Sequence, residues 1–154
     1  MGMKPEERMG NSDASANRES AELRELILGY FSAFTTGDPG WVDRHVSRDP
    51  SLRLIGTAPN EWLQGEAGFD VFRREAAGAT GALAAEVSEV EAYRCDEIGW
   101  GAAQVTFTNQ QGATATARFT VVFHREGPDW KVVNSHTSLP VADDKAFDDR
   151  AFEL

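Results

Sequence analysis

The chain has 154 residues, of which 41% are hydrophobic and 26% are charged. This length and composition predict one soluble globular domain, because domains most often contain about 100–150 residues. The sequence has 25 acidic and 15 basic residues, a net charge of −10. That charge argues against nucleic acid and against an anionic membrane as partners, since both attract clustered positive charge.

Cysteine usage and hydropathy predict a cytoplasmic protein. Cys95 is the single cysteine, so a disulfide within the chain is excluded. No apolar run is long enough to cross a bilayer, and the first residues lack the apolar core of a signal peptide. The three histidines show no close ligand-pair spacing, and no glycine-rich phosphate-binding loop is present. We therefore expect neither a metal site nor a cofactor.

The chain is expected to begin with a disordered leader and a long amphipathic helix. Residues 1–18 are polar and carry few large apolar side chains. Apolar residues then recur with helical spacing from Leu23 to Phe34, after Ser20 or Asn17 as the N-cap. Within this stripe, Tyr30 is expected in the core with one edge turned toward a cavity.

Three further elements are predicted before the long strands. Pro39 starts a short second helix in PGWVDRHV, and SLRLIGT reads as a strand. The segment APNEWLQG is expected to form a loop. A third helix carries Phe69, Val71 and Phe72.

After Gly81 the hydrophobic period changes from helical to alternating. Four strand-like segments, AAEVSEVEAYR, IGWGAAQVTFTN, ATATARFTVVFHR and WKVVNSHTS, are joined by short turns, which predicts an antiparallel meander. Residues 19–140 thus form one domain, and residues 141–154 form an acidic tail with a possible short helix. The predicted class is α+β, with a curved antiparallel sheet wrapped around helices into a cone that encloses a pocket.

The last strand raises the question of what its faces contact. Every second residue from Trp130 gives Trp130, Val132, Asn134, His136 and Ser138, a face that turns from apolar to polar. We expect this face to look into the cone, with Asn134 and His136 near the ligand. His136 would protonate a carbonyl or bind an acidic group. The alternative is a buried imidazole bonded to a neighbouring loop.

The preceding strands offer further candidate ligand contacts. Arg118 lies on a threonine-rich face and would hold a carboxylate if that face lined the cone, or would be solvated if it did not. Trp100 and Gln104 share a face that either lines the cone or, for Trp100, packs in the core. The other face of the Arg118 strand is apolar and is expected to form a homodimer interface through Phe119, Val121 and Phe123.

Glu61 and Trp62 lie in the loop after the first strand of the predicted cone. Glu61 would either point a carboxylate across the pocket mouth or sit near the N-terminus of the third helix. Trp62 would be a lid over the core or a platform for a substrate.

The element order, together with GTAPNEW and FHREGPDWKVVNSHTS, resembles the nuclear transport factor 2-like superfamily and its SnoaL-like branch. The resemblance covers roughly Ala21 to Pro140 and implies the cystatin-like α+β cone. Ketosteroid isomerases with this fold carry an acid at the end of the first strand, whereas this chain has RLIGTAP. Their second acid would fall near Arg118, Phe119 and Thr120. The resemblance therefore argues against isomerase chemistry.

The leading functional hypothesis is a homodimer that binds a small, mostly apolar molecule with a carbonyl or acidic group. Two alternatives stay open. One is a SnoaL-type enzyme, a polyketide cyclase, isomerase or dehydratase, that uses His136 with Glu61 or an ordered water. The other is a dimerisation or interaction module whose cavity is idle.

Overall fold

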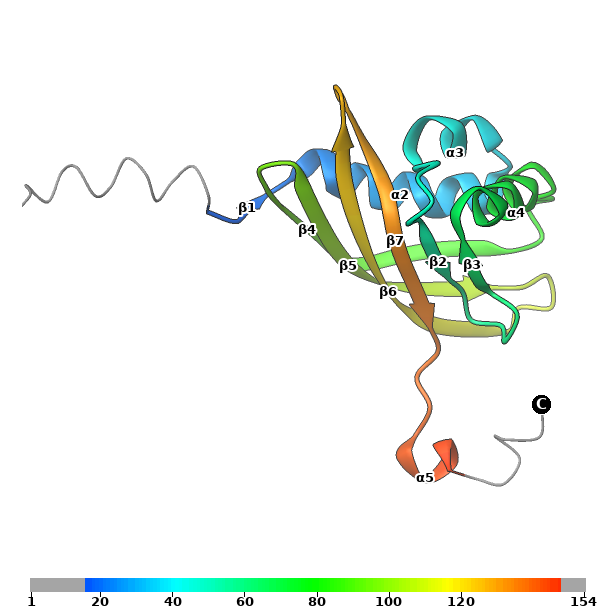
Figure 1. Ribbon diagram of the computed structural model, residues 1–154. Helices are drawn as coiled ribbons and strands as arrows, with labels where there is room; N and C mark the ends of the chain where they lie inside the picture. Colours follow the sequence, from blue (N-terminus) through cyan, green and yellow to red (C-terminus); the bar gives the residue numbers. More distant parts are fainter. Residues whose placement is uncertain (1–15, 148–154) are drawn as a thin grey trace, which may run out of the picture.

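A computed structural model describes residues 16–147, and Figure 1 shows a curved sheet that wraps around one long helix. The sheet has seven strands in the order β1-β4-β5-β6-β7-β2-β3 and does not close into a barrel. Helices α2, α3 and α4 lie on one side of it. The predicted α+β class is confirmed.

Helices α2 and α3 begin at residues that the sequence predicts. Helix α2 spans Ala21–Thr36, and its N-cap Ser20 accepts a hydrogen bond from the Leu23 amide at 3.2 Å. Gly37 closes it with a φ of 88°, a left-handed conformation that favours glycine. Helix α3 spans Pro39–His45, and α4 spans Gly65–Ala77.

The four predicted long strands form an antiparallel meander. They are β4 (Ala84–Cys95), β5 (Ile98–Thr108), β6 (Thr114–Glu126) and β7 (Asp129–Ser138). Three short strands extend the sheet, namely β1 (Arg18–Glu19), β2 (Arg53–Ile55) and β3 (Trp62–Gln64). The sheet is mixed, because β2 runs parallel to β7. Part of the segment expected as a loop is strand β3, which pairs with β2.

Two glycines let α2 lie directly on β5. A Cβ atom on Gly99 would overlap the side chain of Leu23, and one on Gly101 would overlap Ile27. Leu23 and Ile27 are fully buried in this contact. The close approach fixes α2 against the sheet and so places its next turn, which includes Tyr30, against Phe119 of β6.

The apolar face of β6 packs inward against the helices. Phe119, Val121 and Phe123 are all buried in the core of the single chain. The prediction that these three side chains form an exposed dimer interface is therefore wrong. The threonine-rich face with Arg118 is the outer face of the sheet.

A β-bulge in β7 explains the mixed face of its sequence. Phe123 pairs with Val132 and Val122 pairs with Asn134, so Val133 is an extra residue on β7. Trp130 and Val132 point inward before the bulge, and Ser135 is buried after it. The alternation is reversed from that point, so the expected continuous inner face from Trp130 to Ser138 does not exist.

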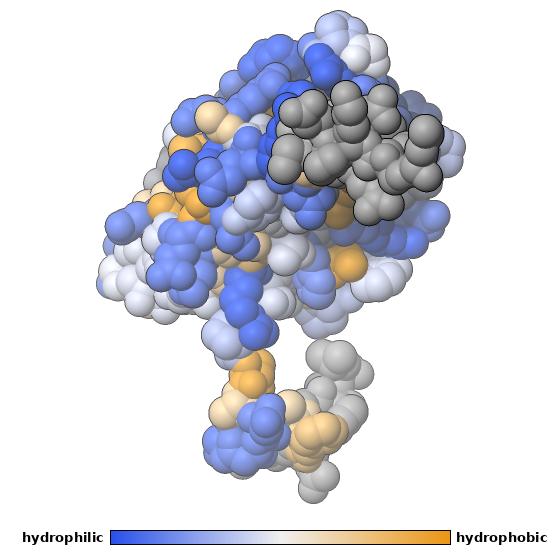
Figure 2. Space-filling model, turned by 90° about the vertical axis from the view of Figure 1, so that its left-hand side faces the viewer, coloured by the Kyte–Doolittle hydropathy of each residue, from blue (hydrophilic) through white to orange (hydrophobic). Residues whose placement is uncertain are grey.

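The sheet begins one residue earlier than the expected domain boundary, and a short helix lies in the expected tail. Arg18 pairs with Arg94 of β4, so the residue expected to end the leader belongs to the sheet, and residues 1–15 lie outside the described residues. Helix α5 spans Asp143–Ala146 and stands apart from the domain (Figures 1 and 2). Phe147 beside it is 80% exposed. Within residues 16–147, none of the helices has the length and apolar composition that a membrane-spanning helix needs.

Candidate functional site

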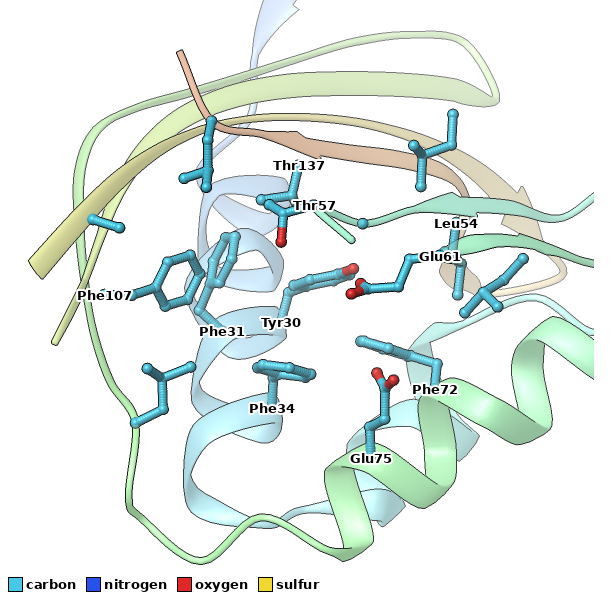
Figure 3. A pocket seen from close by; sticks show the side chains of 16 residues that line it. Tyr30, Phe31, Phe34, Leu54, Thr57, Glu61, Phe72, Glu75, Phe107 and Thr137 are labelled. Atoms are coloured by element: carbon cyan, nitrogen blue, oxygen red, sulfur yellow. The ribbon is translucent and has the colours of Figure 1, made fainter. Parts of the chain in front are cut away.

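A pocket of about 290 Å³ lies where α2, α4 and the β2–β3 hairpin meet the ends of the long strands (Figure 3). Helix α2 contributes Tyr30, Phe31 and Phe34 to the lining. The remaining described lining residues are Leu54, Ile55, Gly56, Thr57, Glu61, Leu63, Phe72, Glu75, Leu83, Phe107, Ala115, Thr137 and Leu139. The pocket is thus an aromatic and aliphatic chamber with a few polar groups.

Tyr30 forms part of the pocket wall and has a hydrogen-bonded hydroxyl. Its ring lies 5.0 Å from the Phe72 ring and 4.9 Å from the Phe119 ring, measured between centroids. Its hydroxyl is 3.2 Å from the Ser135 hydroxyl, and either oxygen can donate. Burial raises the pKa of Tyr30 to about 12, so the phenol stays neutral and offers a hydrogen bond rather than a charge.

Glu61 enters the pocket from the turn between β2 and β3. Two backbone hydrogen bonds close the turn. The Gly56 amide donates to the Glu61 carbonyl at 2.9 Å, and the Glu61 amide donates to the Ala58 carbonyl at 3.0 Å. The Glu61 carboxylate accepts a longer bond from the Ala58 amide at 3.3 Å. A Cβ atom on Gly56 would overlap this carboxylate, so glycine at this position is what leaves room for the acid.

A second carboxylate, Glu75, reaches the pocket from α4. Phe69, Phe72 and Ala76 form the buried face of this helix, and Glu75 lies at the edge of that face, three residues after Phe72. Burial raises the pKa of the Glu75 carboxyl, and the charge of Glu61 raises it further. Figure 3 shows both carboxylates beside the rings of Tyr30, Phe34 and Phe72.

Two of the candidate residues from the sequence line this pocket, namely Tyr30 and Glu61. Of the two alternatives for Glu61, the structure shows the one in which its carboxylate points into the pocket. The N-cap of α4 is Gln64, which makes no side-chain capping bond.

His136 and Arg118 lie on the outer face of the sheet. Both side chains are exposed, and neither lines the pocket. The prediction that they share the cavity is wrong, because the bulge at Val133 turns His136 outward and the inner face of β6 is the apolar one. Asn134 is turned outward by the same bulge and is exposed.

The other predicted contacts also lie outside the pocket. Gln104 pairs with Arg118 and is exposed on the same face. Trp100 is on that face too and stacks on Tyr93, with ring centroids 6.2 Å apart. Trp62 is 64% exposed, with the Arg53 guanidinium 4.8 Å from its ring centroid.

Sequence reasoning missed Glu75, Thr57 and the strand-end residues Phe107, Ala115 and Thr137. For Glu75 a signal exists in the sequence, since an acid three residues after a core phenylalanine falls at the border of the buried helix face. Whether the other missed residues line the pocket depends on which strand ends lie beside the β2–β3 hairpin. Across residues 16–147, no three His, Cys, Asp or Glu side chains gather closely enough to hold a metal ion.

Comparison with known proteins agrees with this architecture. The sequence profile of the SnoaL-like domain matches residues 13–142. No curated protein sequence gives a significant match. A nuclear transport factor 2-like protein of unknown function from Pseudomonas putida is similar in structure, with 18% identity and a TM-score of 0.67 over 81% of this chain and 89% of that chain.

Two further solved structures are similar. A nuclear transport factor 2-like superfamily protein from Salmonella enterica has 16% identity and a TM-score of 0.61 over 79% of this chain and 91% of that chain. A protein with a cystatin-like fold from Caulobacter vibrioides has 16% identity and a TM-score of 0.61 over 93% of this chain and 98% of that chain. These structural similarities show the fold alone, because proteins that share a fold can have unrelated activities. The profile match covers most of the sequence, and the chain therefore belongs to the SnoaL-like domain family.

Proposed function

We propose that this SnoaL-like domain binds a small, largely apolar molecule in the pocket between α2, α4 and the β2–β3 hairpin. The lining carries the proposal, since ten of its sixteen described residues are phenylalanine, leucine, isoleucine or alanine. A volume of about 290 Å³ is near the lower end of the range for small-molecule sites, about 300–1,000 Å³. A molecule with one or two rings fits this space.

The residues that line the pocket change which polar group we expect on the ligand. The acidic group expected from the sequence depended on Arg118 and His136, and neither side chain lines the pocket. A carboxylate ligand would instead meet Glu61 and Glu75, which repel it. A carbonyl remains compatible, because the hydroxyls of Tyr30 and Thr57 can donate to it.

Two substitutions at adjacent positions of β6 test the proposal. Ala115 lines the pocket, whereas Thr114 does not. Ala115→Leu should fill part of the cavity and weaken the binding of 2-phenylethanol at least about tenfold, because overfilled cavities exclude ligands. Thr114→Leu should leave affinity within about twofold. Calorimetry and saturation-transfer NMR measure both; equal affinities in the two variants would contradict binding in this pocket.

An idle cavity, the interaction-module alternative from the sequence, predicts no saturable binding of the probe by the wild-type protein. The same titration therefore separates these two classes. The expected cytoplasmic location stays a prediction that this experiment does not address.

Acid–base catalysis in the same pocket is a second candidate function. The raised pKa of Glu75 favours it, since a carboxyl that titrates closer to neutral pH exchanges protons more readily with a bound substrate. Proton exchange at the α-carbons of cyclohexanone in D₂O, followed by NMR, would reveal such activity. Glu75→Gln should abolish the exchange if the candidate is right. Exchange that persists in this variant would contradict a catalytic Glu75.

A further inference from the structure

The ionisable groups in the pocket are all acidic. Tyr30, Glu61 and Glu75 are its titratable residues, and none of the sixteen described lining residues is Lys, Arg or His. Tyr30 stays neutral because burial raises its pKa to about 12. The pocket therefore has two carboxylates and no cation of its own to neutralise them.

The two carboxylates interact with each other inside this apolar space. They come from different elements, Glu61 from the β2–β3 turn and Glu75 from α4, and the charge of Glu61 acts on Glu75. Like charges that share a site repel, and the repulsion is relieved by a proton on one of them or by a positive charge nearby. A cationic ligand would supply that positive charge, and both carboxylates would stay ionised.

Aromatic rings surround the same region. Phe34 and Phe72 are stacked with an angle of 9° between their planes and centroids 6.2 Å apart, and Tyr30 is stacked on Phe72. Ring faces attract cations within about 6 Å, and the attraction grows when water is excluded. Figure 3 shows both carboxylates beside these rings, so aromatic and acidic attraction act on one volume.

We infer that the pocket selects a cationic amine, an ammonium group on a small apolar body, with the ammonium held by Glu61, Glu75 and the aromatic rings. The apolar body would lie against Phe31 and Phe107, which also line the pocket. The inference rests on the proposed function and adds the charge of the ligand. The net charge of −10 acts in the same direction, because it raises the local concentration of cations.

Two probes of similar shape test the charge preference in the wild-type protein at about pH 7.5. They are the 2-phenylethylammonium ion and neutral 2-phenylethanol, titrated by calorimetry at low salt. We expect the cation to bind at least about tenfold more tightly, and the difference to shrink as salt screens the charges. This comparison needs no substitution, so it does not depend on how well any variant folds.

Three glutamate substitutions then locate the preference. Glu61→Gln and Glu75→Gln should each weaken the cation several-fold and leave the alcohol nearly unchanged. Glu86→Gln is the matched control, since Glu86 is exposed on β4 and does not line the pocket. It should change neither affinity.

The outcomes separate this inference from the proposed function. If the alcohol binds as tightly as the cation, and Ala115→Leu still weakens it, the pocket binds small molecules and the inferred amine selectivity is wrong. If the cation preference survives in the Glu61→Gln/Glu75→Gln double variant, the inferred site is wrong. If neither probe shows saturable binding, both proposals are wrong.

Discussion

Glu75 lies at the edge of the buried face of α4, and its environment gives it an unusual protonation equilibrium. Burial and then the charge of Glu61 raise its carboxyl pKa in the folded protein. The folded state thus holds this proton more tightly than the unfolded chain does. As pH rises from the ordinary carboxyl range to the raised pKa, ionisation of Glu75 makes folding progressively less favourable.

Glu75→Gln should remove this pH dependence. The melting temperature of the variant relative to the wild type should increase as pH rises through that window, and then become constant above the raised pKa. Thermal unfolding followed by circular dichroism between about pH 4 and pH 8 measures the difference. Other carboxyls, such as Asp43 with its pKa lowered by Arg73, are present in both proteins. Their contributions therefore cancel in the difference between the two melting temperatures. A difference independent of pH would contradict the raised pKa.

At the residue scale, the sequence predicted Tyr30 and Glu61 but missed Glu75. Tyr30 lies in an apolar helical stripe, and the stripe alone indicates an inward ring. The position of Glu61 depends on Gly56, which is five residues earlier and leaves space for the carboxylate. His136 was placed in the pocket by counting alternate residues from Trp130, and that count fails at the bulge.

At the scale of elements, β7 is joined to α2 by one buried hydrogen bond. The Tyr30 hydroxyl and the Ser135 hydroxyl are 3.2 Å apart, and Ser135 is 1% exposed. Ser135 points inward because it follows the bulge at Val133. The bond therefore stabilises both the helix position and the register of the strand after the bulge.

A double-mutant cycle should measure this link. Ser135→Ala leaves the buried phenol without this partner, at an expected cost of about 1–3 kcal/mol in the free energy of unfolding. Tyr30→Phe together with Ser135→Ala should cost less than the sum of the single changes, with a coupling of at least about 0.5 kcal/mol. Urea unfolding gives these values, with Ser138→Ala as the control on the same strand. Additive effects would show that the bond contributes nothing.

The sequence predicted those elements whose periodicity is local. Helices α2, α3 and α4 and the four long strands follow from spacing, caps and turns. The pairing of β2 with β7 is parallel and joins residues about eighty positions apart, and no local pattern signals it. The bulge at Val133 is equally invisible, because it arises from how β7 pairs with β6.

At the scale of the whole molecule, self-association stays a prediction, now with a different surface. The outer face of the sheet carries Trp100, stacked on Tyr93 and paired with Val122 on the next strand. Ile98 on the same face is 43% exposed. These side chains form an apolar area that a second copy of the chain would cover.

Sedimentation equilibrium at micromolar concentration should give the mass of a dimer. Val122→Glu should shift the protein to monomers, because it places a charge beside Trp100 in that area. Thr114→Glu, at the end of β6, is the control and should leave the dimer intact. A monomeric wild-type protein at these concentrations would rule out this interface.

The extra residue in β7 affects how this chain should be compared with its relatives. In a regular strand, residues that share a face with the tryptophan lie at even distances from it, whereas here Ser135 shares the inner face of Trp130 at a distance of five. Consider a relative without the bulge, whose residues are matched to this chain by their distance from the tryptophan. A pocket side chain of that relative would then be matched to a side chain on the outer surface of this protein. An alignment that preserves side-chain direction must place a one-residue gap at Val133. Only after that gap can pocket residues be compared between members of the family.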